Sequence, residues 1–345
     1  MDHNEFFAAL NAGNVAACYL FEGEEEYTKR AALQALRERL TAGEFAAMND
    51  ATLRDPAPDA LIAAAETLPF MTDRRLVVVR DCAMLSGSKP KDYDEDKAIE
   101  QLTAYLDHLP DTACIVFYVA GKADARRKLY GVLKKKATLV SFKTLDDKQL
   151  SQWIVRELKK GGRGITGADC ERLWFTVGRD LNLLTGETEK LIAYTDGRDS
   201  VTAADIQAIC TQSREYKVFD LATVLLSGQA KKALTMAGDM LRGGEERLYL
   251  LTLLGGQCRK MYYAAAMKKT GAGESAIASA LGVPVFAVRT ALQQASGYTM
   301  AQMRTMCALC VETEFRVKSG EAPEEGSLEG VMLQILAMRQ RKGRC

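Results

Sequence analysis

The sequence predicts a multidomain protein of the α/β plus α class, with a parallel α/β domain first and helical domains after it. Up to about residue 145, short apolar β-rich runs alternate with helical patterns. Strands this apolar, separated by helices, are typical of a parallel sheet that is covered on both faces. After that point only helical periodicity remains. The chain has 345 residues, 48% of them hydrophobic, so it can bury the cores of two or three domains.

The α/β domain is expected to span residues 1–145. Each expected strand is a short run rich in apolar, β-branched or aromatic residues. These strands are residues 18–21, 45–48, 76–79, 114–119 and 138–142. The helices expected between them are residues 27–40, 59–66, 96–106 and 125–135.

Two helical regions are expected after the α/β domain. Residues 146–211 are expected to form a small bundle, because helical patterns follow one another between glycine-rich breaks. Its helices are expected at residues 148–160, 168–177, 181–195 and 203–210. Residues 212–345 are expected to form a further helical domain, in which apolar residues recur at spacings of three and four along one helix face. These residues are Leu250, Leu253, Leu254, Cys258 and Met261.

Composition limits the function classes. Lysine plus arginine number 46 and aspartate plus glutamate 45, so net charge alone does not attract the chain to nucleic acid or to a membrane. The start of the chain lacks a basic region followed by an apolar one, and no run approaches the roughly 18 apolar residues of a membrane span. We therefore expect a soluble, cytoplasmic protein without a membrane partner.

Cysteine and histidine usage does not indicate a metal site or a disulfide framework. Nine cysteines, an odd number, are scattered along the chain, so they do not form a disulfide framework. Most of them are expected to be buried as small apolar residues. The C-x-x-C pair, Cys307 and Cys310, lies in a helical stretch without two further ligands nearby. With His3 and His108 as the two histidines, no Ser/His/Asp set can be assembled convincingly. No metal, no cofactor and no catalytic residue is expected.

One segment near the start has the layout of a phosphate-binding loop but lacks the residues that hold phosphate. An apolar strand turns at Gly23 into a helix, and the pattern G-x-x-x-x-G-K-[ST] requires a second glycine, a lysine and a hydroxyl. Those three places hold Thr28, Lys29 and Arg30. Glutamates fill residues 24–26, so a polyphosphate would meet carboxylates rather than amides. The loop is expected not to bind nucleotide, and an ordinary βα turn is the alternative interpretation.

Seven stretches, in their order and spacing, are similar to one known family. They are YLFEGEEEYTKR (19–30), LPFMTDRRLVVVRD (68–81), DTACIVFYVAGKADARRKLYGVLKKK (111–136), GRDLNLLTGETEKL (178–191), FDLATVLLSGQAKKAL (219–234), LLGGQCRKMYYA (253–264) and LGVPVFAVRTALQQA (281–295). Together with the domain order, they make the chain resemble the clamp-loader branch of the AAA+ ATPases, and within it the delta-subunit family of bacterial DNA polymerase III.

This resemblance implies a domain plan and a role. Residues 1–145 would be an AAA+-like α/β domain with a degenerate phosphate loop, residues 146–211 a small helical lid, and residues 212–345 a collar that holds the subunits together. The family binds the sliding clamp (beta) and opens the ring for loading onto primed DNA. Its implied partners are the gamma/tau and delta-prime subunits of a hetero-pentamer, and primer-template DNA through the assembled complex.

The resemblance also implies that the chain does not hydrolyse ATP itself. In an active relative, Asp-Glu follows the strand that ends here at Val79, whereas this chain has Arg80, Asp81 and Cys82. The Ser-Arg-Cys signature with which some clamp-loader subunits complete a neighbour's ATP site is missing around residues 134–143. The chain would still be a subunit of a DNA-directed DNA polymerase holoenzyme, a nucleotidyltransferase.

A hydrophobic wedge is expected at Leu68, Pro69, Phe70 and Met71. In the family that this chain resembles, an exposed wedge just before this strand enters a pocket on the clamp. Apolar anchors suit that role because burying a large side chain contributes roughly 1.5 to 3 kcal/mol, and proline stiffens the segment before it binds. Phe70 is the expected main anchor. The alternative is that Leu68 and Phe70 are core residues that cap the preceding helix.

Contact with DNA backbone is expected from a basic cluster, since phosphate contacts require cations. The cluster comprises Arg126, Arg127, Lys128, Lys134, Lys135 and Lys136. A second one comprises Arg339, Arg341, Lys342 and Arg344. A solvated helix face is the alternative reading of such runs.

Arg179 lies where related ATPases carry a nucleotide-sensing arginine, and here a structural role beside an acidic residue is expected.

Two rival functions stay open: an active ATPase with an unusual loop, and a stator-type scaffold that never binds the clamp. The scaffold hypothesis predicts that Phe70 is buried.

Overall fold

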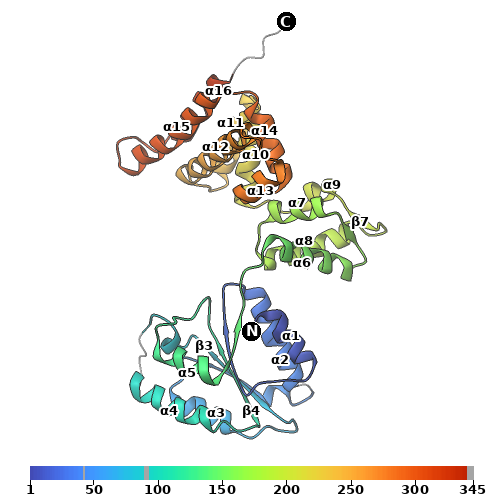
Figure 1. Cartoon of the computed structure of the whole chain (residues 1–345), viewed down its shortest axis with the longest axis vertical. Coiled ribbons are helices and arrows are strands. Elements are labelled where there is room, and N and C mark those ends of the chain that lie inside the picture. Colours follow the sequence, from blue (N-terminus) through green and yellow to red (C-terminus); the bar gives the residue numbers. More distant parts are fainter. Residues whose placement is uncertain (42, 89–92, 340–345) are drawn as a thin grey trace. The chain divides into compact units, whose positions relative to one another are not determined.

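A five-stranded parallel sheet organises the first part of the chain (Figure 1). Its strands are β1 (Cys18–Glu22), β2 (Asp50–Arg54), β3 (Arg75–Arg80), β4 (Ala113–Tyr118) and β5 (Thr138–Ser141). They lie in the order β2-β3-β4-β1-β5, and each neighbouring pair is parallel. The computed structural model describes residues 1–41, 43–88 and 93–339, and the chain divides into two units, residues 1–146 and 147–345.

Helices cover both faces of this sheet. α1 (His3–Asn11) and α2 (Glu26–Leu40) pack on one face, and α3 (Pro58–Glu66), α4 (Glu95–Asp107) and α5 (Lys128–Lys136) pack on the other. Successive strand residues face opposite sides, so Val77 and Val79 of β3 enter one core and Leu76 and Val78 enter the other. The predicted parallel sheet with two covered faces is confirmed.

The structure corrects the expected strand at residues 45–48. This segment contains a 3-10 turn, η1 (Ala46–Met48), and the strand follows it as β2. β2 lies at the edge of the sheet and is only partly buried, so Asp50, Thr52 and Arg54 can be polar and the apolar signal is weak. Three further elements were not expected: α1, which Asp2 and Glu5 start with a capping box, and the short parallel strands β6 (Gly164–Ile165) and β7 (Ser200–Val201).

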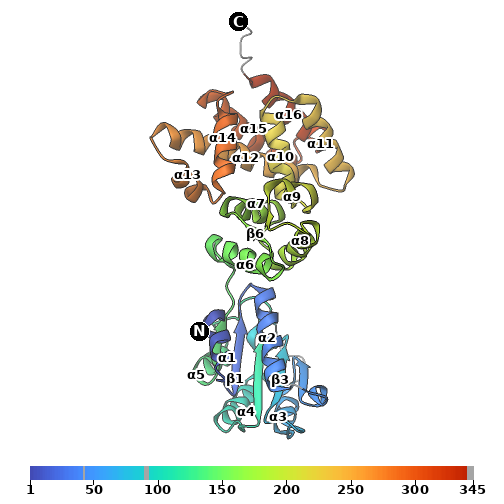
Figure 2. The ribbon, with the colours of Figure 1, turned by 90° about the vertical axis from the view of Figure 1, so that its right-hand side faces the viewer.

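The second unit is helical apart from these two short strands (Figure 2). Its first helices are α6 (Asp147–Lys160), α7 (Gly167–Val177), α8 (Leu181–Tyr194) and α9 (Ala203–Ile209). They are followed by α10 (Arg214–Leu226), α11 (Ala230–Arg242), α12 (Arg247–Lys269), α13 (Glu274–Leu281), α14 (Val285–Ala295), α15 (Met300–Lys318) and α16 (Ser327–Met338). The predicted helices of residues 146–211 agree with α6 to α9, whereas a separate domain from residue 212 onward stays a prediction.

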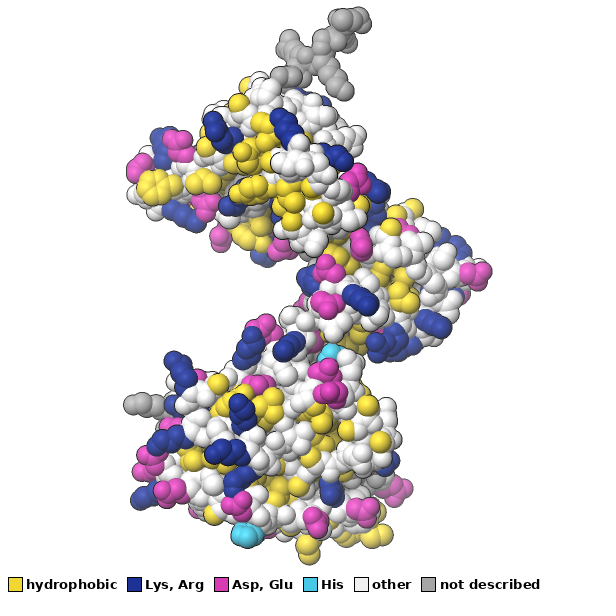
Figure 3. Space-filling view, viewed as in Figure 1, with side chains coloured by type: hydrophobic (Ala, Val, Ile, Leu, Met, Phe, Trp, Pro, Cys, Tyr) yellow, Lys and Arg dark blue, Asp and Glu magenta, His cyan; other side chains and the backbone are white. Residues whose placement is uncertain are grey.

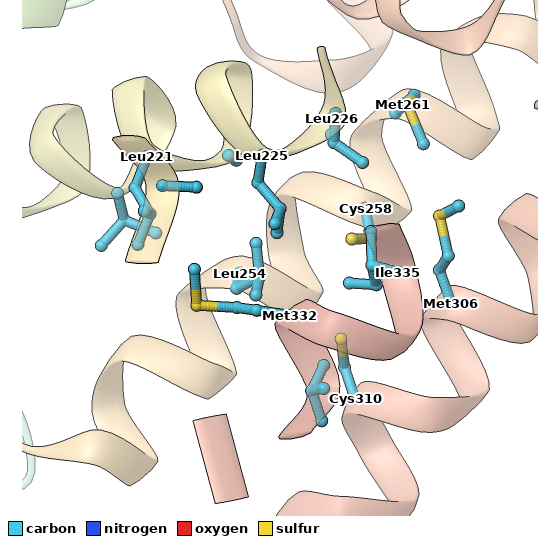
Figure 4. Close-up of a cluster of buried hydrophobic side chains, with 14 of the residues drawn as sticks. Leu221, Leu225, Leu226, Leu254, Cys258, Met261, Met306, Cys310, Met332 and Ile335 are labelled. Atoms are coloured by element: carbon cyan, nitrogen blue, oxygen red, sulfur yellow. The ribbon is translucent and has the colours of Figure 1, made fainter. Parts of the chain in front are cut away.

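The core of the second unit lies where α10, α12, α15 and α16 meet. Figure 4 shows Leu221, Leu225 and Leu226 of α10, Leu254, Cys258 and Met261 of α12, Met306 and Cys310 of α15, and Met332 and Ile335 of α16. The apolar face predicted for α12 therefore contributes to this core, with Leu253 at its partly buried margin.

Membrane-spanning potential is limited to one bent helix pair. Among the residues that the structure describes, no single helix combines the length and apolar composition needed to cross a membrane. α13 and α14 satisfy those criteria only when they are taken together, and they are bent by 103° at the break between them.

Candidate functional site

Exposed apolar side chains of the first unit gather in two segments. Among its described residues, the exposed large apolar side chains other than Met1 are Phe45, Met48, Leu68, Phe70 and Met71. We call these five side chains the apolar edge. Single exposed apolar residues are common on protein surfaces, but a gathered set marks a binding surface.

The apolar edge lies at the amino-terminal end of the sheet. One segment directly precedes β2 and the other directly precedes β3, and parallel strands begin at the same edge of a sheet. Figure 3 shows hydrophobic side chains projecting at the lower end of the α/β unit. The phosphate-loop turn follows β1 and therefore lies at the opposite edge.

The predicted wedge residues are exposed. Leu68 is 76% exposed, Phe70 49% and Met71 79%, while Pro69 is partly buried. The alternative that Leu68 and Phe70 are core residues is therefore wrong, and the buried Phe70 that the scaffold hypothesis predicted is not found. Met71 has a φ of 57°, a left-handed conformation that is uncommon for a residue with a large side chain.

Phe45 and Met48 were missed as surface residues because their segment was read as a strand. The rings of Phe45 and Phe70 meet edge to face, with centroids 5.0 Å apart and an interplanar angle of 86°. The spacing of three between Phe45 and Met48 is the sequence signal that could have found them, since it fits one helical turn better than a strand.

The backbone of the phosphate-like loop is already occupied by internal hydrogen bonds. The Gly23 N–H donates to the Gly121 carbonyl at 2.7 Å, and the Glu25 N–H donates to the Phe142 carbonyl at 3.0 Å. The Tyr27 N–H donates to the Glu25 carboxylate at 3.2 Å. A Cβ on Gly23 would lie 2.1 Å from the Phe142 oxygen, so this position needs glycine for close chain approach. These amides are turned to the protein rather than to a ligand.

Lys29 is fully buried and holds this loop closed. Its Nζ donates to the Gly23 carbonyl at 2.8 Å and to the Val119 carbonyl at 2.7 Å, and pairs with the Glu26 carboxylate at 2.6 Å. Burial raises the pKa of Glu26, but hydrogen bonds from Lys29 and Tyr118 outweigh it and hold that pKa below its usual value. The lysine that would bind phosphate in an ATPase is a structural cation here.

The other predicted loop positions do not form a phosphate site. Thr28 is partly buried on α2, and Arg30 is exposed with its Nε donating to the Glu26 carbonyl at 3.4 Å. A hollow of about 530 Å³ beside the loop is lined in part by Glu22 and Glu24. Lys122 and Lys143 also line the hollow, but Lys122 pairs with the Glu24 carboxylate at 3.4 Å. Because the loop amides that would wrap a phosphate donate within the protein, the geometry does not support the ATPase hypothesis.

Much of the predicted basic cluster is paired with carboxylates. Its ion pairs are Arg126 with Asp124 at 2.9 Å, Arg127 with Glu95 at 3.1 Å, Lys128 with Asp96 at 2.6 Å, and Lys136 with Asp107. Hydrogen bonds from Arg126 lower the pKa of Asp124 to about 2. Lys134 and Lys135 are exposed on the last turn of α5. In the second cluster only Arg339 lies within the described residues, whereas Arg341, Lys342 and Arg344 lie outside them.

Arg179 has the structural role that was expected. Its Nη1 lies 2.5 Å from the Asp147 Oδ1, and its guanidinium stacks over the Trp174 ring at 5.2 Å.

Cys307 and Cys310 lie on α15, and across the described ranges no three potential metal ligands gather.

The chain matches two models of one protein family. The model described as "DNA polymerase III, delta subunit" matches residues 19–143, and that described as "DNA polymerase III delta subunit, C-terminal domain" matches residues 215–335. A curated relative, DNA polymerase III subunit delta of Bacillus subtilis, is 27% identical over 340 residues, which cover 98% of both chains. The probable DNA polymerase III subunit delta of Aquifex aeolicus is 23% identical over 73% of this chain and 72% of its own.

A solved structure agrees with these sequence matches. The DNA clamp loader delta protein of Bacillus subtilis superposes with a TM-score of 0.55 at 26% identity, covering 97% of this chain and 99% of its own. The similarity therefore extends over both units of the chain.

Proposed function

Because the chain belongs to the DNA polymerase III delta subunit family, whose members are clamp-loader subunits, we propose that it binds the sliding clamp and opens the ring for loading onto primed DNA. The binding element is the segment Leu68, Pro69, Phe70 and Met71. The observation that carries this proposal is the exposure of its three large apolar side chains at one edge of the sheet. Exposing such an apolar surface to water is unfavourable in free energy, so the surface is expected to be covered by a partner protein.

Ring opening requires no chemistry in this chain. A subunit that binds the opened clamp edge more tightly than the closed edge shifts the equilibrium of the ring by the difference in affinity. The closed loop around Lys29 fits this role, because it leaves ATP binding and hydrolysis to neighbouring subunits.

The remaining partners follow from the same family role. We propose that the chain works in the cytoplasm with gamma/tau and delta-prime subunits in a hetero-pentamer, and that helices after residue 212 form its collar contacts. The assembled loader would meet primer-template DNA through the basic cluster of residues 126–136. Lys134 and Lys135 are the strongest candidates there, because no carboxylate contact within 4.0 Å is found for them among the described residues.

The test is direct binding of the purified chain to its sliding clamp, without nucleotide. A folded Phe70→Ala, Met71→Ala variant is expected to bind at least about 30-fold more weakly, because truncating central apolar anchors typically removes 2 kcal/mol or more. Leu183→Ala is the matched control, since Leu183 is an exposed apolar residue of α8. A parent chain that does not bind, or a double variant that binds equally well, would overturn the proposal.

A further inference from the structure

Asn49 joins the two segments of the apolar edge. It is fully buried between η1 and β2, and its side chain forms a pair of hydrogen bonds with the backbone of one residue. The Phe70 N–H donates to the Asn49 Oδ1 at 2.7 Å, and the Asn49 Nδ2 donates to the Phe70 carbonyl at 2.8 Å. A third bond, from Nδ2 to the Phe45 carbonyl, measures 3.4 Å. One amide therefore contacts both segments.

The backbone around Asn49 fixes the same two segments to the sheet. Its carbonyl accepts from the Leu76 N–H at 2.8 Å, at the start of β3. The Arg75 guanidinium donates to the Met48 carbonyl at 2.5 Å. These bonds set η1 beside the wedge, where the Phe45 ring meets the Phe70 ring.

Resting on the proposed function, we propose that two segments make the clamp contact, with Phe45 and Met48 completing the surface and Asn49 positioning Phe70. A loop that presents an apolar anchor loses conformational entropy when it binds, unless it is already held in its bound shape. The paired hydrogen bonds hold Phe70 in the free protein. The left-handed Met71 directs the chain onward to β3 while its side chain stays in solvent.

The surface also indicates the chemistry of the clamp site that receives it. An edge-to-face aromatic pair flanked by methionine and leucine side chains needs an apolar groove wide enough for two rings. Exposed Glu44, Glu66 and Asp73 lie next to the two segments in sequence, whereas Arg74 and Arg75 are partly buried and donate to the Val15 and Met48 carbonyls. A groove with a basic rim would therefore complement this edge, and rim charges act mainly on the association rate.

Phe45→Ala and Met48→Ala test the segment that precedes β2, and they leave the hydrophobic core intact because both side chains are exposed. Each is expected to weaken clamp binding by about fivefold to tenfold. The unfolding midpoint should stay unchanged in Met48→Ala and fall slightly in Phe45→Ala, which loses the ring contact with Phe70. Leu183→Ala again serves as the exposed apolar control. If both variants bind the purified clamp as the parent does, the segment of residues 45–48 is not part of the contact.

Asn49→Ala tests the positioning role through a double-mutant cycle with Phe70→Ala. In the parent chain it is expected to weaken clamp binding about tenfold, and in the Phe70→Ala background most of that loss should disappear, since Asn49 acts through Phe70. Val140→Ala, a buried change in β5, controls for lost stability and should lower the unfolding midpoint without changing clamp affinity.

The outcomes separate this inference from the function on which it rests. If the parent chain does not bind the clamp, the proposed function itself fails. If the parent binds and Phe70→Ala weakens it, but Asn49→Ala and the η1 variants bind normally, only the two-segment inference fails. Equal losses from Asn49→Ala with and without Phe70 would overturn the positioning role.

Discussion

At the scale of single residues, a buried polar side chain that hydrogen-bonds to backbone groups fixes a loop at each edge of the sheet. At the carboxyl-terminal edge, Lys29 fills the loop and satisfies two backbone carbonyls. At the amino-terminal edge, Asn49 satisfies the backbone of Phe70 and leaves the ring of that residue exposed. A buried polar side chain is costly unless it is hydrogen-bonded, and both residues meet that condition.

Lys29→Met is expected to destabilise the first unit by about 2 to 3 kcal/mol, because it leaves the Gly23 and Val119 carbonyls without a buried donor. Urea unfolding followed by circular dichroism measures this loss. Arg30→Met, at the exposed neighbouring position, should change stability by less than about 0.5 kcal/mol. A Lys29→Met variant as stable as the parent would show that the buried ammonium is not structural.

The ion pair of Lys29 gives stability a defined pH dependence. The folded-state pKa of Glu26 lies below its ordinary value of 4.5, so its contribution is present above pH 4.5 and is lost as pH falls through the folded pKa. We expect Glu26→Gln to be less stable than the parent at neutral pH, with the difference shrinking below pH 4.5. Unfolding curves at several pH values test this. A difference that grows toward acid would contradict it.

Met71 separates stability from binding. Its left-handed backbone costs about 1 to 2 kcal/mol for a residue with a side chain, and glycine relieves that cost but adds about 0.5 to 1 kcal/mol of chain entropy. Met71→Gly is therefore expected to unfold at or slightly above the parent midpoint while binding the clamp more weakly. Met71→Val, a β-branched residue, should lower the midpoint. Equal stability of the two variants would show that the strain is absent.

At the scale of elements, the strands buried on both faces could be predicted and the edge elements could not. β1, β3 and β4 are continuous apolar runs because helices cover both of their faces. β2 is a partly exposed edge strand, and its polar residues interrupt the apolar pattern by which a strand is predicted from sequence. The pairing of Asn49 with Phe70 joins positions 21 residues apart, and no local pattern encodes such a contact. The wedge was predicted from family resemblance, whereas the proposed addition of Phe45 and Met48 needed the structure.

Helix α5 gives a prediction for DNA contact. Lys134 and Lys135 lie at its exposed end, while Arg126 and Lys128 are neutralised by Asp124 and Asp96. Lys134→Ala, Lys135→Ala should therefore weaken binding of primer-template DNA by the assembled loader and reduce the slope of log K against log salt by up to about 2. Arg126→Ala is the control and should change that slope little. The opposite pattern would move the DNA contact to the ion-paired residues just before α5.

At the scale of the whole molecule, we assign clamp binding to the first unit and subunit assembly to the second. The apolar edge lies entirely within residues 1–146, whose helices and sheet form their own buried cores. The large helical core lies within the second unit, and we propose that the helices of this unit after residue 212 make the collar contacts. A unit with its own core is expected to fold when it is expressed alone.

The fragment of residues 1–146 is therefore expected to fold and to bind the sliding clamp within about threefold of the affinity of the full chain, because it holds both segments of the apolar edge. Circular dichroism and a cooperative urea transition establish folding, and titration of the clamp measures affinity. Phe70→Ala in the fragment should cause the same fold-loss as in the full chain. A folded fragment that binds far more weakly would show that the second unit supplies clamp contacts, because Asn49 and all five apolar side chains are present in both.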